Sequence, residues 1–170
     1  GVSFHLVSRG GLPGLRRSLK KMDPSVLQKL KAADCDAYEY PPDFNWETEM
    51  MRVKGLVWKL ETILGMILKV DDQVQDASYF AEIYHRFLDR EKNQWNTSIC
   101  FLFSSFGNLF THWGNSDFCR PNENYIEEAI KYIESQGFVF VIGDVLEQEY
   151  DGLAEGLHGY TWHARYFSYL

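Results

Sequence analysis

The clearest pattern of hydrophobic positions lies between Trp46 and Leu64, where apolar residues recur three and four positions apart. This spacing places side chains on one face of an α-helix, and charged residues fall between the apolar positions. The pattern predicts one helix over residues 46–64, ended by Gly65 in the left-handed conformation that glycine adopts easily. The stripe that we expect to be buried comprises Met50, Val53, Val57, Leu60 and Leu64.

The first third of the chain is predicted to be mostly helical. Residues 2–7 alternate loosely between apolar and polar side chains and suggest a short strand. Residues 13–21 begin with proline, which is suited to the first position of a helix. Residues 23–33 begin with Asp-Pro, a typical helix start, and predict a second helix. A loop is expected over residues 34–45, with its aromatic side chains packed on the core.

A further amphipathic helix is expected near the middle of the second half of the chain. Asn122 and Glu123 form its start, it runs to Ser135, and Gly137 ends it. Its acidic residues concentrate in the first half, where the helix dipole stabilises negative charge. The expected apolar face comprises Tyr125, Ile126, Ala129, Ile130 and Ile133.

Apolar, aromatic and β-branched runs predict the strands. Residues 77–84 are ambiguous because Ala and Glu are compatible with a helix, but the aromatic residues favour a strand. Residues 98–103 and 109–113 flank a tight connection at residues 106–108, which predicts a hairpin. Residues 138–142 are continuously apolar, which indicates a central strand. Other extended segments are expected at residues 66–70, 145–150 and 160–167.

This order of elements predicts the fold class. Helices come first, and a run of strands interrupted by one helix follows, which is typical of the α+β class. We expect a largely antiparallel sheet of about five to six strands with helices packed on one face. The length is that of one ordinary domain, so residues 1–170 are predicted to form a single globular domain.

Composition narrows the class of protein further. Hydrophobic residues make up 45% and charged residues 24%, which excludes disordered and fibrous classes. The longest apolar run, residues 63–68, is far shorter than the ~20 residues of a membrane span, and the first residues lack the apolar core of a signal peptide. The three cysteines, Cys35, Cys100 and Cys119, form no Cys-x-x-Cys pair and no even set. We therefore expect a protein without membrane association or disulfides, in the reducing cytoplasm.

The charge is unevenly distributed along the chain. The net charge is −7, yet the first 33 residues hold seven Lys or Arg and one acid. The remaining residues hold ten basic and 23 acidic side chains. An acidic body disfavours nucleic-acid binding, because phosphate contacts need a basic surface. We interpret the basic N-terminal stretch as the solvated face of helices near the acidic body.

Several patterns that would indicate bound groups are incomplete. The loop over residues 10–14 is rich in glycine and precedes basic residues, but it has neither the Gly-Lys-[Ser/Thr] ending of a phosphate loop nor the GxGxxG fingerprint. None of the five histidines has a histidine four positions away. His112, Asp117 and Cys119 come closest to a metal-ligand set, but they are too few soft ligands for a zinc site. No metal or cofactor is predicted.

No catalytic residue is assigned from the sequence either. The chain lacks a GxSxG nucleophile motif and any known cysteine-protease signature. Cys100 lies in an apolar strand, which favours an inert core thiol, although folding could pair it with His112 on the neighbouring strand. The protein is therefore expected to be non-enzymatic, with that pairing left open.

The dense acidic stretch in the last third is the strongest functional signal. Residues 122–155 hold nine acids and a single base, Lys131. Crowded like charges repel one another, and a basic partner would relieve that repulsion. Exposed tyrosines could anchor such a contact, since Tyr and Trp are enriched at interfaces. The candidate binding residues are Asp144, Glu147, Glu149, Tyr150, Asp151, Glu155 and Tyr160.

Two functions follow from these features. The first is a non-enzymatic acidic module that binds a basic protein, in the manner of an immunity protein that neutralises a nuclease toxin; this is an analogy of character and not of motif. The alternative is a small enzyme or ligand-binding protein with a noncontiguous site on the sheet. A deep pocket with converging His, Cys or carboxylate groups would favour the alternative, whereas a flat acidic surface with exposed aromatic residues would favour the binding module.

Overall fold

The computed structural model describes residues 25–169 of the chain. Within them the helices are α2 (Val26–Ala32), α3 (Trp46–Lys54), α4 (Val57–Leu64), α5 (Ser116–Cys119), α6 (Glu123–Ser135) and α7 (Trp162–Phe167), with 3₁₀ turns η1 (Asp144–Glu147) and η2 (Glu155–Leu157). The strands are β1 (Lys69–Asp71), β2 (Tyr79–Asp89), β3 (Gln94–Ser104), β4 (Leu109–Gly114) and β5 (Val139–Phe140). The elements expected over residues 2–7 and 13–21, and the Asp-Pro helix start at residues 23–24, lie outside the described residues.

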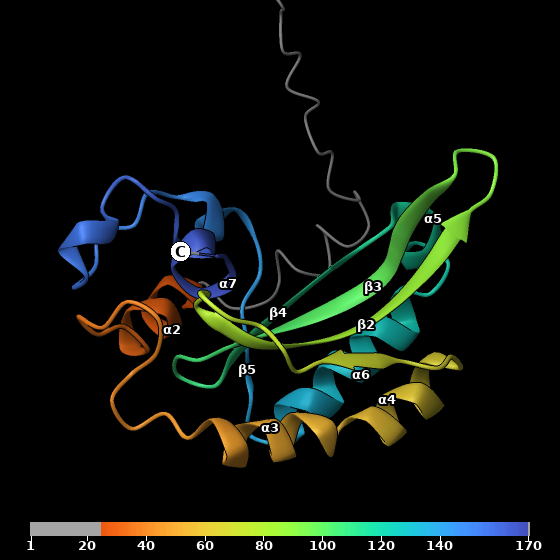
Figure 1. Cartoon of the computed structure of the whole chain (residues 1–170), viewed down its shortest axis with the longest axis horizontal. Coiled ribbons are helices and arrows are strands. Elements are labelled where there is room, and N and C mark those ends of the chain that lie inside the picture. Colours follow the sequence, from red (N-terminus) through yellow and green to blue (C-terminus); the bar gives the residue numbers. More distant parts are fainter. Residues whose placement is uncertain (1–24, 170) are drawn as a thin grey trace, which may run out of the picture.

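The strands form one sheet in the order β1-β2-β3-β4-β5. The first four are antiparallel neighbours, and β5 runs parallel to β4. The predicted hairpin of β3 and β4 is confirmed, as is the choice of a strand for residues 77–84, which lie mainly in β2. Figure 1 shows β2 and β3 as a long curved pair that projects beyond the rest of the sheet. The α+β class with a largely antiparallel sheet is confirmed.

One face of the sheet is covered by α3, α4 and α6 (Figure 1). The predicted apolar faces of these helices supply the packing: α6, for example, buries Ile126, Ala129, Ile130 and Ile133. Tyr125 was expected with them but is 53% exposed, because it lies at the edge of the apolar stripe. From the sheet, this core receives Ile83, Ile99, Phe101, Phe103, Phe110 and Phe140.

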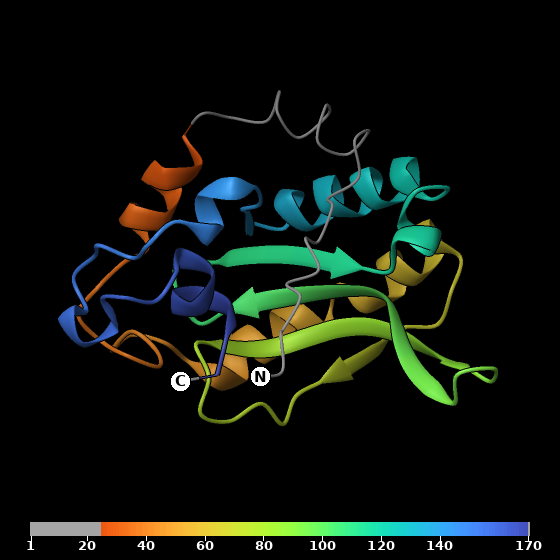
Figure 2. The same ribbon diagram turned by 90° about the horizontal axis from the view of Figure 1, so that it is seen from above.

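The opposite face is covered at one end by α2, α7 and the segment between β5 and α7 (Figures 1 and 2). Helices therefore lie on both faces of the sheet and not on one face alone. This second core contains Leu30, Leu102, Phe106, Leu109, Tyr150, Trp162 and Tyr166. In the loop that precedes α3, Phe44 packs on the first core as expected, but Tyr38 and Tyr40 are more than half exposed.

The helix expected over residues 46–64 is broken into α3 and α4 at Gly55. The amide of Gly55 still binds the carbonyl of Met51, but the next amide, that of Leu56, binds Val53 three residues back. This tighter turn interrupts the helix, and Leu56 within it is buried in the core. The predicted stripe remains on the buried side, with Val57 only partly buried. Gly65 ends α4 with φ of 64°, as expected.

The placement of residues 138–142 corrects a prediction. The segment was expected to be a central strand, but β5 is at the edge of the sheet and only two residues long. Its apolar character has a different cause. Phe138 and Phe140 belong to the core under α3, α4 and α6, whereas Val141 belongs to the core on the other face. A segment packed between two cores is apolar on both sides even at a sheet edge.

The predictions of extended structure for residues 145–150 and 160–167 are both wrong. Residues 145–150 begin in the 3₁₀ turn η1, and most of residues 160–167 form the helix α7. The side chain of Thr161 accepts a hydrogen bond from the amide of Ala164 at 3.1 Å and caps α7. Trp162, Arg165 and Tyr166, spaced three and four apart, then all turn toward the core. Aromatic content alone cannot distinguish such a helix from a strand.

Candidate binding surface

The acidic segment lies at the end of the molecule that holds α2 and α7 (Figures 1 and 2). All five acids predicted for the binding surface are exposed: Asp144, Glu147, Glu149, Asp151 and Glu155. Tyr160 is 58% exposed, so its ring is accessible on the surface. Six of the seven predicted binding residues thus lie on the surface of one continuous segment.

Tyr150 is the exception, because only 1% of it is exposed. Its hydroxyl donates to the carboxylate of Asp34 at 2.8 Å and accepts from the amide of Ala154, also at 2.8 Å. Its ring packs edge-on against Trp162 with the ring centres 4.7 Å apart. Burial raises the pKa of the Tyr150 hydroxyl, which therefore stays protonated as a donor. Tyr150 supports the surface from below and is not an anchor on it.

A buried ion pair under this surface was not foreseen from the sequence. Nε of Arg165 donates to Oδ1 of Asp34 at 3.0 Å. The other guanidinium nitrogens donate to the carbonyls of Tyr38, Cys35 and Ala37 at 2.9, 3.0 and 2.7 Å. The guanidinium carbon also lies 4.1 Å from the ring centre of Phe106. These bonds use four of the five N–H groups of Arg165, as a buried cation requires.

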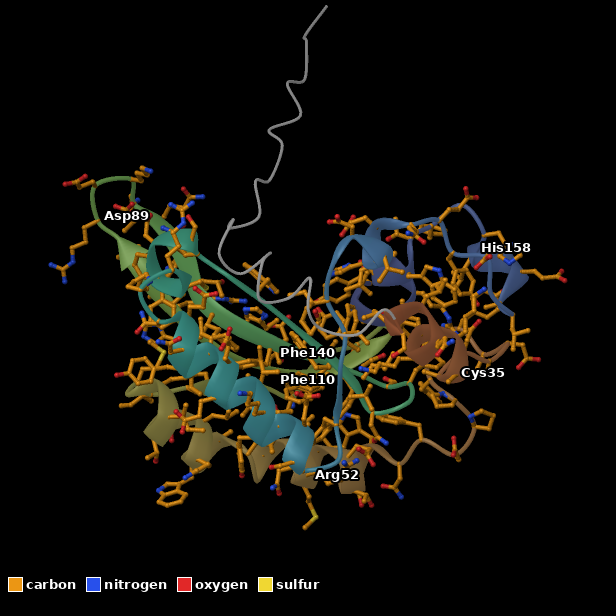
Figure 3. All side chains as sticks on the ribbon, turned by 180° about the vertical axis from the view of Figure 1, so that it is seen from behind. Cys35, Arg52, Asp89, Phe110, Phe140 and His158 are labelled. Carbon is orange, nitrogen blue, oxygen red and sulfur yellow. The ribbon has the colours of Figure 1, made fainter. Side chains whose placement is uncertain are left out.

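This ion pair holds two surface segments side by side. Arg165 binds the carbonyls of the loop at residues 35–38, while Asp34 also accepts the amide of Leu153 at 2.8 Å. Tyr38 lies directly against Gly156, where an added Cβ would meet the tyrosine hydroxyl. Figure 3, viewed from behind, shows Cys35 and His158 at the same end of the molecule.

We call the resulting surface the acidic end. Its residues come from the loop that follows α2 and from the segment between β5 and α7. Beside the predicted residues, sequence reasoning missed two exposed apolar groups, Tyr38 at 51% and Leu153 at 65%. No local pattern marks them, because they become neighbours only through the buried ion pair. The acidic end comprises Asp36, Tyr38, Glu39, Asp144, Glu147, Glu149, Asp151, Leu153, Glu155 and Tyr160.

The residues considered for a metal or for catalysis do not converge. Over residues 25–169, no three His, Cys, Asp or Glu side chains gather as a metal site would require. His112 and Cys119 are buried, whereas Asp117 is exposed. Burial raises the pKa of Cys119 to about 11. The arrangement therefore offers no ligand set at this loop among the described residues.

The Cys100–His112 pair left open by the sequence does not form. His112 is the cross-strand partner of Phe101 and shares its face of the sheet, whereas Cys100 belongs to the core on the other face. Burial raises the pKa of the Cys100 thiol far above its usual range, so it is protonated and unreactive. Burial lowers the pKa of His112 to about 4, and its Nδ1 has no hydrogen-bond partner within the described part of the chain.

The chain as a whole was also compared with known proteins. No protein family, curated protein or solved structure matches it. Among residues 25–169, no helix has the length and apolarity needed to cross a bilayer. Inference about function therefore depends on the surfaces themselves.

Proposed function

We propose that this protein is a non-enzymatic binding module whose acidic end holds a basic protein partner. One observation carries the proposal: five exposed acids lie on one segment together with Leu153 and Tyr160, and the buried ion pair fixes that segment against Tyr38. Interfaces of this kind combine exposed aromatic or apolar anchors with complementary charge.

Rigidity of the acidic end supports a binding role. Loops that are ordered only on binding cost conformational entropy, which weakens association. Here the backbone is already held by Arg165, by Asp34 and by the bond between the His158 ring and the carbonyl of Gly152 at 2.7 Å. A preorganised surface loses little entropy when a partner docks.

The charge indicates the chemistry of the partner. A surface that presents carboxylates attracts a protein rich in Lys and Arg and speeds its association. Enzymes that act on nucleic acids carry such basic surfaces, so an immunity-type inhibitor of a nuclease toxin is the specific form of the proposal. The free thiols of Cys35, Cys100 and Cys119 agree with the cytoplasm as its location.

Affinity capture with matched variants tests this proposal. The test variant carries Glu147→Lys, Glu149→Lys and Asp151→Lys. The control carries Glu91→Lys, Glu128→Lys and Glu134→Lys, which change the net charge equally at exposed positions on the β2–β3 hairpin and on α6. Each protein is used to capture partners from a lysate of the source cells at low salt, and bound proteins are quantified by mass spectrometry.

The proposal expects at least one basic protein that the wild type and the control retain and the test variant loses. Equal capture by all three proteins would show that the acidic end is not the binding surface. Circular dichroism of both variants confirms that the comparison is made between folded proteins.

A further inference from the structure

A second surface feature lies on the sheet, at the place where β1 begins beside β2. It is a shallow pocket of about 330 Å³, near the lower limit for cavities that bind small organic ligands. Figure 3 shows the hairpin residue Asp89 and His158, which lies beside the acidic end, at opposite ends of the molecule. The pocket belongs to the hairpin side, and it is lined by Ile67, Lys69, Tyr84, His85, Arg86 and Trp95.

The strand register explains how these side chains meet. Lys69, the first residue of β1, is the cross-strand partner of Tyr84. The pairing of β1 with β2 therefore does not extend past Tyr84 along β2. The register of β2 and β3 then shifts between His85 and Arg86, a bulge that redirects the following side chains. At the bulge, Nδ1 of His85 and Oγ of Ser98 lie 2.9 Å apart and share a hydrogen bond.

The pocket carries positive charge with unused donors. The Arg86 guanidinium carbon lies 4.5 Å from the ring centre of Tyr84, which orients the side chain over the ring. It forms an ion pair with Glu82, whose Oε2 lies 3.8 Å from a guanidinium nitrogen, a distance longer than a hydrogen bond. Among residues 25–169, this ion pair is the polar side-chain contact of Arg86, and no hydrogen bond joins the side chain of Arg86 or of Lys69 to another residue. Lys69 and Arg86, whose ion pair with Glu82 is too long to be a hydrogen bond, therefore keep donors that an anion could accept.

Apolar and aromatic side chains form the remainder of the wall. Trp95 is 66% exposed and Ile67 is 79% exposed, although large apolar groups usually lie inside. An exposed indole beside a cationic pocket offers a flat surface on which a planar ring can stack. Phe87 and Leu88, at 39% and 40% exposed, extend the apolar character of the hairpin.

We infer that this pocket binds a planar aromatic anion of about mononucleotide size, with its phosphate or carboxylate on Lys69 and Arg86 and its ring on Trp95. The site is separate from the acidic end, so it neither requires nor competes with the proposed protein partner. The ligand is small, which makes this site chemically distinct from a surface that holds a protein.

NMR titration of the full chain tests the inference. The probes are adenosine monophosphate and indole-3-carboxylate. Adenosine is the control that has the ring without the negative charge, and inorganic phosphate is the control that has the charge without the ring. At least one of the first two probes should shift the signals of Lys69, Arg86 and the Trp95 indole N–H and saturate below about 5 mM. Adenosine and phosphate should bind about tenfold more weakly or worse.

Matched variants complete the test. Lys69→Gln with Arg86→Gln should weaken binding of the anionic probe at least about tenfold, and Trp95→Ala should weaken it also. Arg90→Gln with Lys92→Gln, on the exposed hairpin tip, should leave binding unchanged. The inference is overturned if neither anionic probe shifts these signals, if phosphate binds as tightly as the aromatic anions, or if the hairpin variant loses as much affinity as the pocket variant. Unchanged signals of the core residues show that each variant is folded.

Discussion

Nε of Arg165 lies 3.0 Å from Oδ1 of Asp34, and the two side chains are 0% and 2% exposed. The carboxylate also accepts hydrogen bonds from the Tyr150 hydroxyl and the Leu153 amide. Both buried charges are thus hydrogen-bonded to further protein groups, since the guanidinium also donates to three backbone carbonyls. Such compensation is needed because an unpaired charge in this position would be strongly unfavourable. The pair connects α7 to the loop after α2 and thereby defines the shape of the acidic end.

Removing one member of this pair should destabilise the fold severely. Arg165→Met leaves the Asp34 carboxylate buried beside an apolar group, and we expect a loss of roughly 3–5 kcal/mol in the free energy of unfolding. Adding Asp34→Asn removes the uncompensated charge, so the double variant should lose less stability than the sum of the losses of the two single variants. Urea denaturation measures the free energy of unfolding of the two single variants and of the double variant. Additive losses would mean that the two side chains are not energetically coupled.

The buried stripe of α3 and α4 predicts a strong dependence on Leu60. This residue is fully buried among the helices and the sheet, so Leu60→Ala should cost roughly 2–5 kcal/mol through lost contacts and a residual cavity. Trp58, two residues earlier, is 76% exposed and provides the control. Trp58→Ala should change stability by less than about 0.5 kcal/mol. Similar losses for the two variants would contradict the assignment of the buried face.

His112 should make stability fall as the solution becomes acidic. Its folded pKa is lowered to about 4 by burial, below the usual value of 6.5. Between these values the unfolded chain binds a proton that the folded chain does not, so stability falls as the pH decreases from 6.5 to 4. The shift corresponds to a loss on the order of 3 kcal/mol, complete below the folded pKa.

The variant His112→Phe isolates this effect. The imidazole lies between the rings of Phe101 and Phe140, with ring centres 6.1 and 6.2 Å away, so a phenyl ring suits its surroundings. Chemical denaturation across the same pH range should show a shallower decline for the variant than for the wild type. Parallel curves would indicate that His112 does not titrate as expected.

Stability should be independent of metal ions and of thiol reductants. Cys35, Cys100 and Cys119 are free thiols, and structural metal binding would contribute directly to folding. We expect the same thermal midpoint with a chelator, with a reductant and in plain buffer. A fall of many degrees with the chelator would contradict this expectation and would reopen the region of His112, Asp117 and Cys119 as a candidate metal site.

Association kinetics should report the charge of the acidic end once a partner has been captured. Reversal of Glu147, Glu149 and Asp151 should slow association by about an order of magnitude at low salt. The difference in association rate between the variant and the wild type should shrink as the salt concentration approaches about 0.5 M, because salt screens the attraction between the acidic end and its partner. An association rate and salt dependence equal to those of the wild type would rule out electrostatic attraction at this surface.

The hydrophobic pattern along the sequence predicted correctly those helices whose buried side follows from the spacing of their own apolar residues. The stripe from Met50 to Leu64, with Val57 partly buried, and the apolar face of α6, apart from Tyr125, are correct because a helix in contact with a sheet must bury one side. The ambiguity at residues 77–84 was resolved by tertiary pairing, since β3 forms a register with β2 from Tyr79 to Asp89. Aromatic content favoured that strand but did not require it.

The candidate site was predictable only in its charge. Exposed acids follow from composition, because five carboxylates in one short segment are rarely buried. The burial of Tyr150 was not predictable, since its hydroxyl is satisfied by Asp34, 116 residues away. For the same reason Arg165 was assigned to a strand with no specific role. Both errors come from contacts between residues that are distant in sequence, which no local pattern encodes.

The distance along the chain between Asp34 and Arg165 also has a consequence for biosynthesis. The carbonyls of Cys35, Ala37 and Tyr38 are held by a guanidinium that is synthesised 127–130 residues later. While the ribosome is still translating the sheet, the loop after α2 and the Asp34 carboxylate lack the guanidinium that they bind in the folded chain. The helices and the sheet meander can form from contacts that are nearer in sequence, which fold earlier and faster. We therefore expect the contacts of Arg165 with Asp34 and with the loop after α2 to form later than the sheet as the chain emerges.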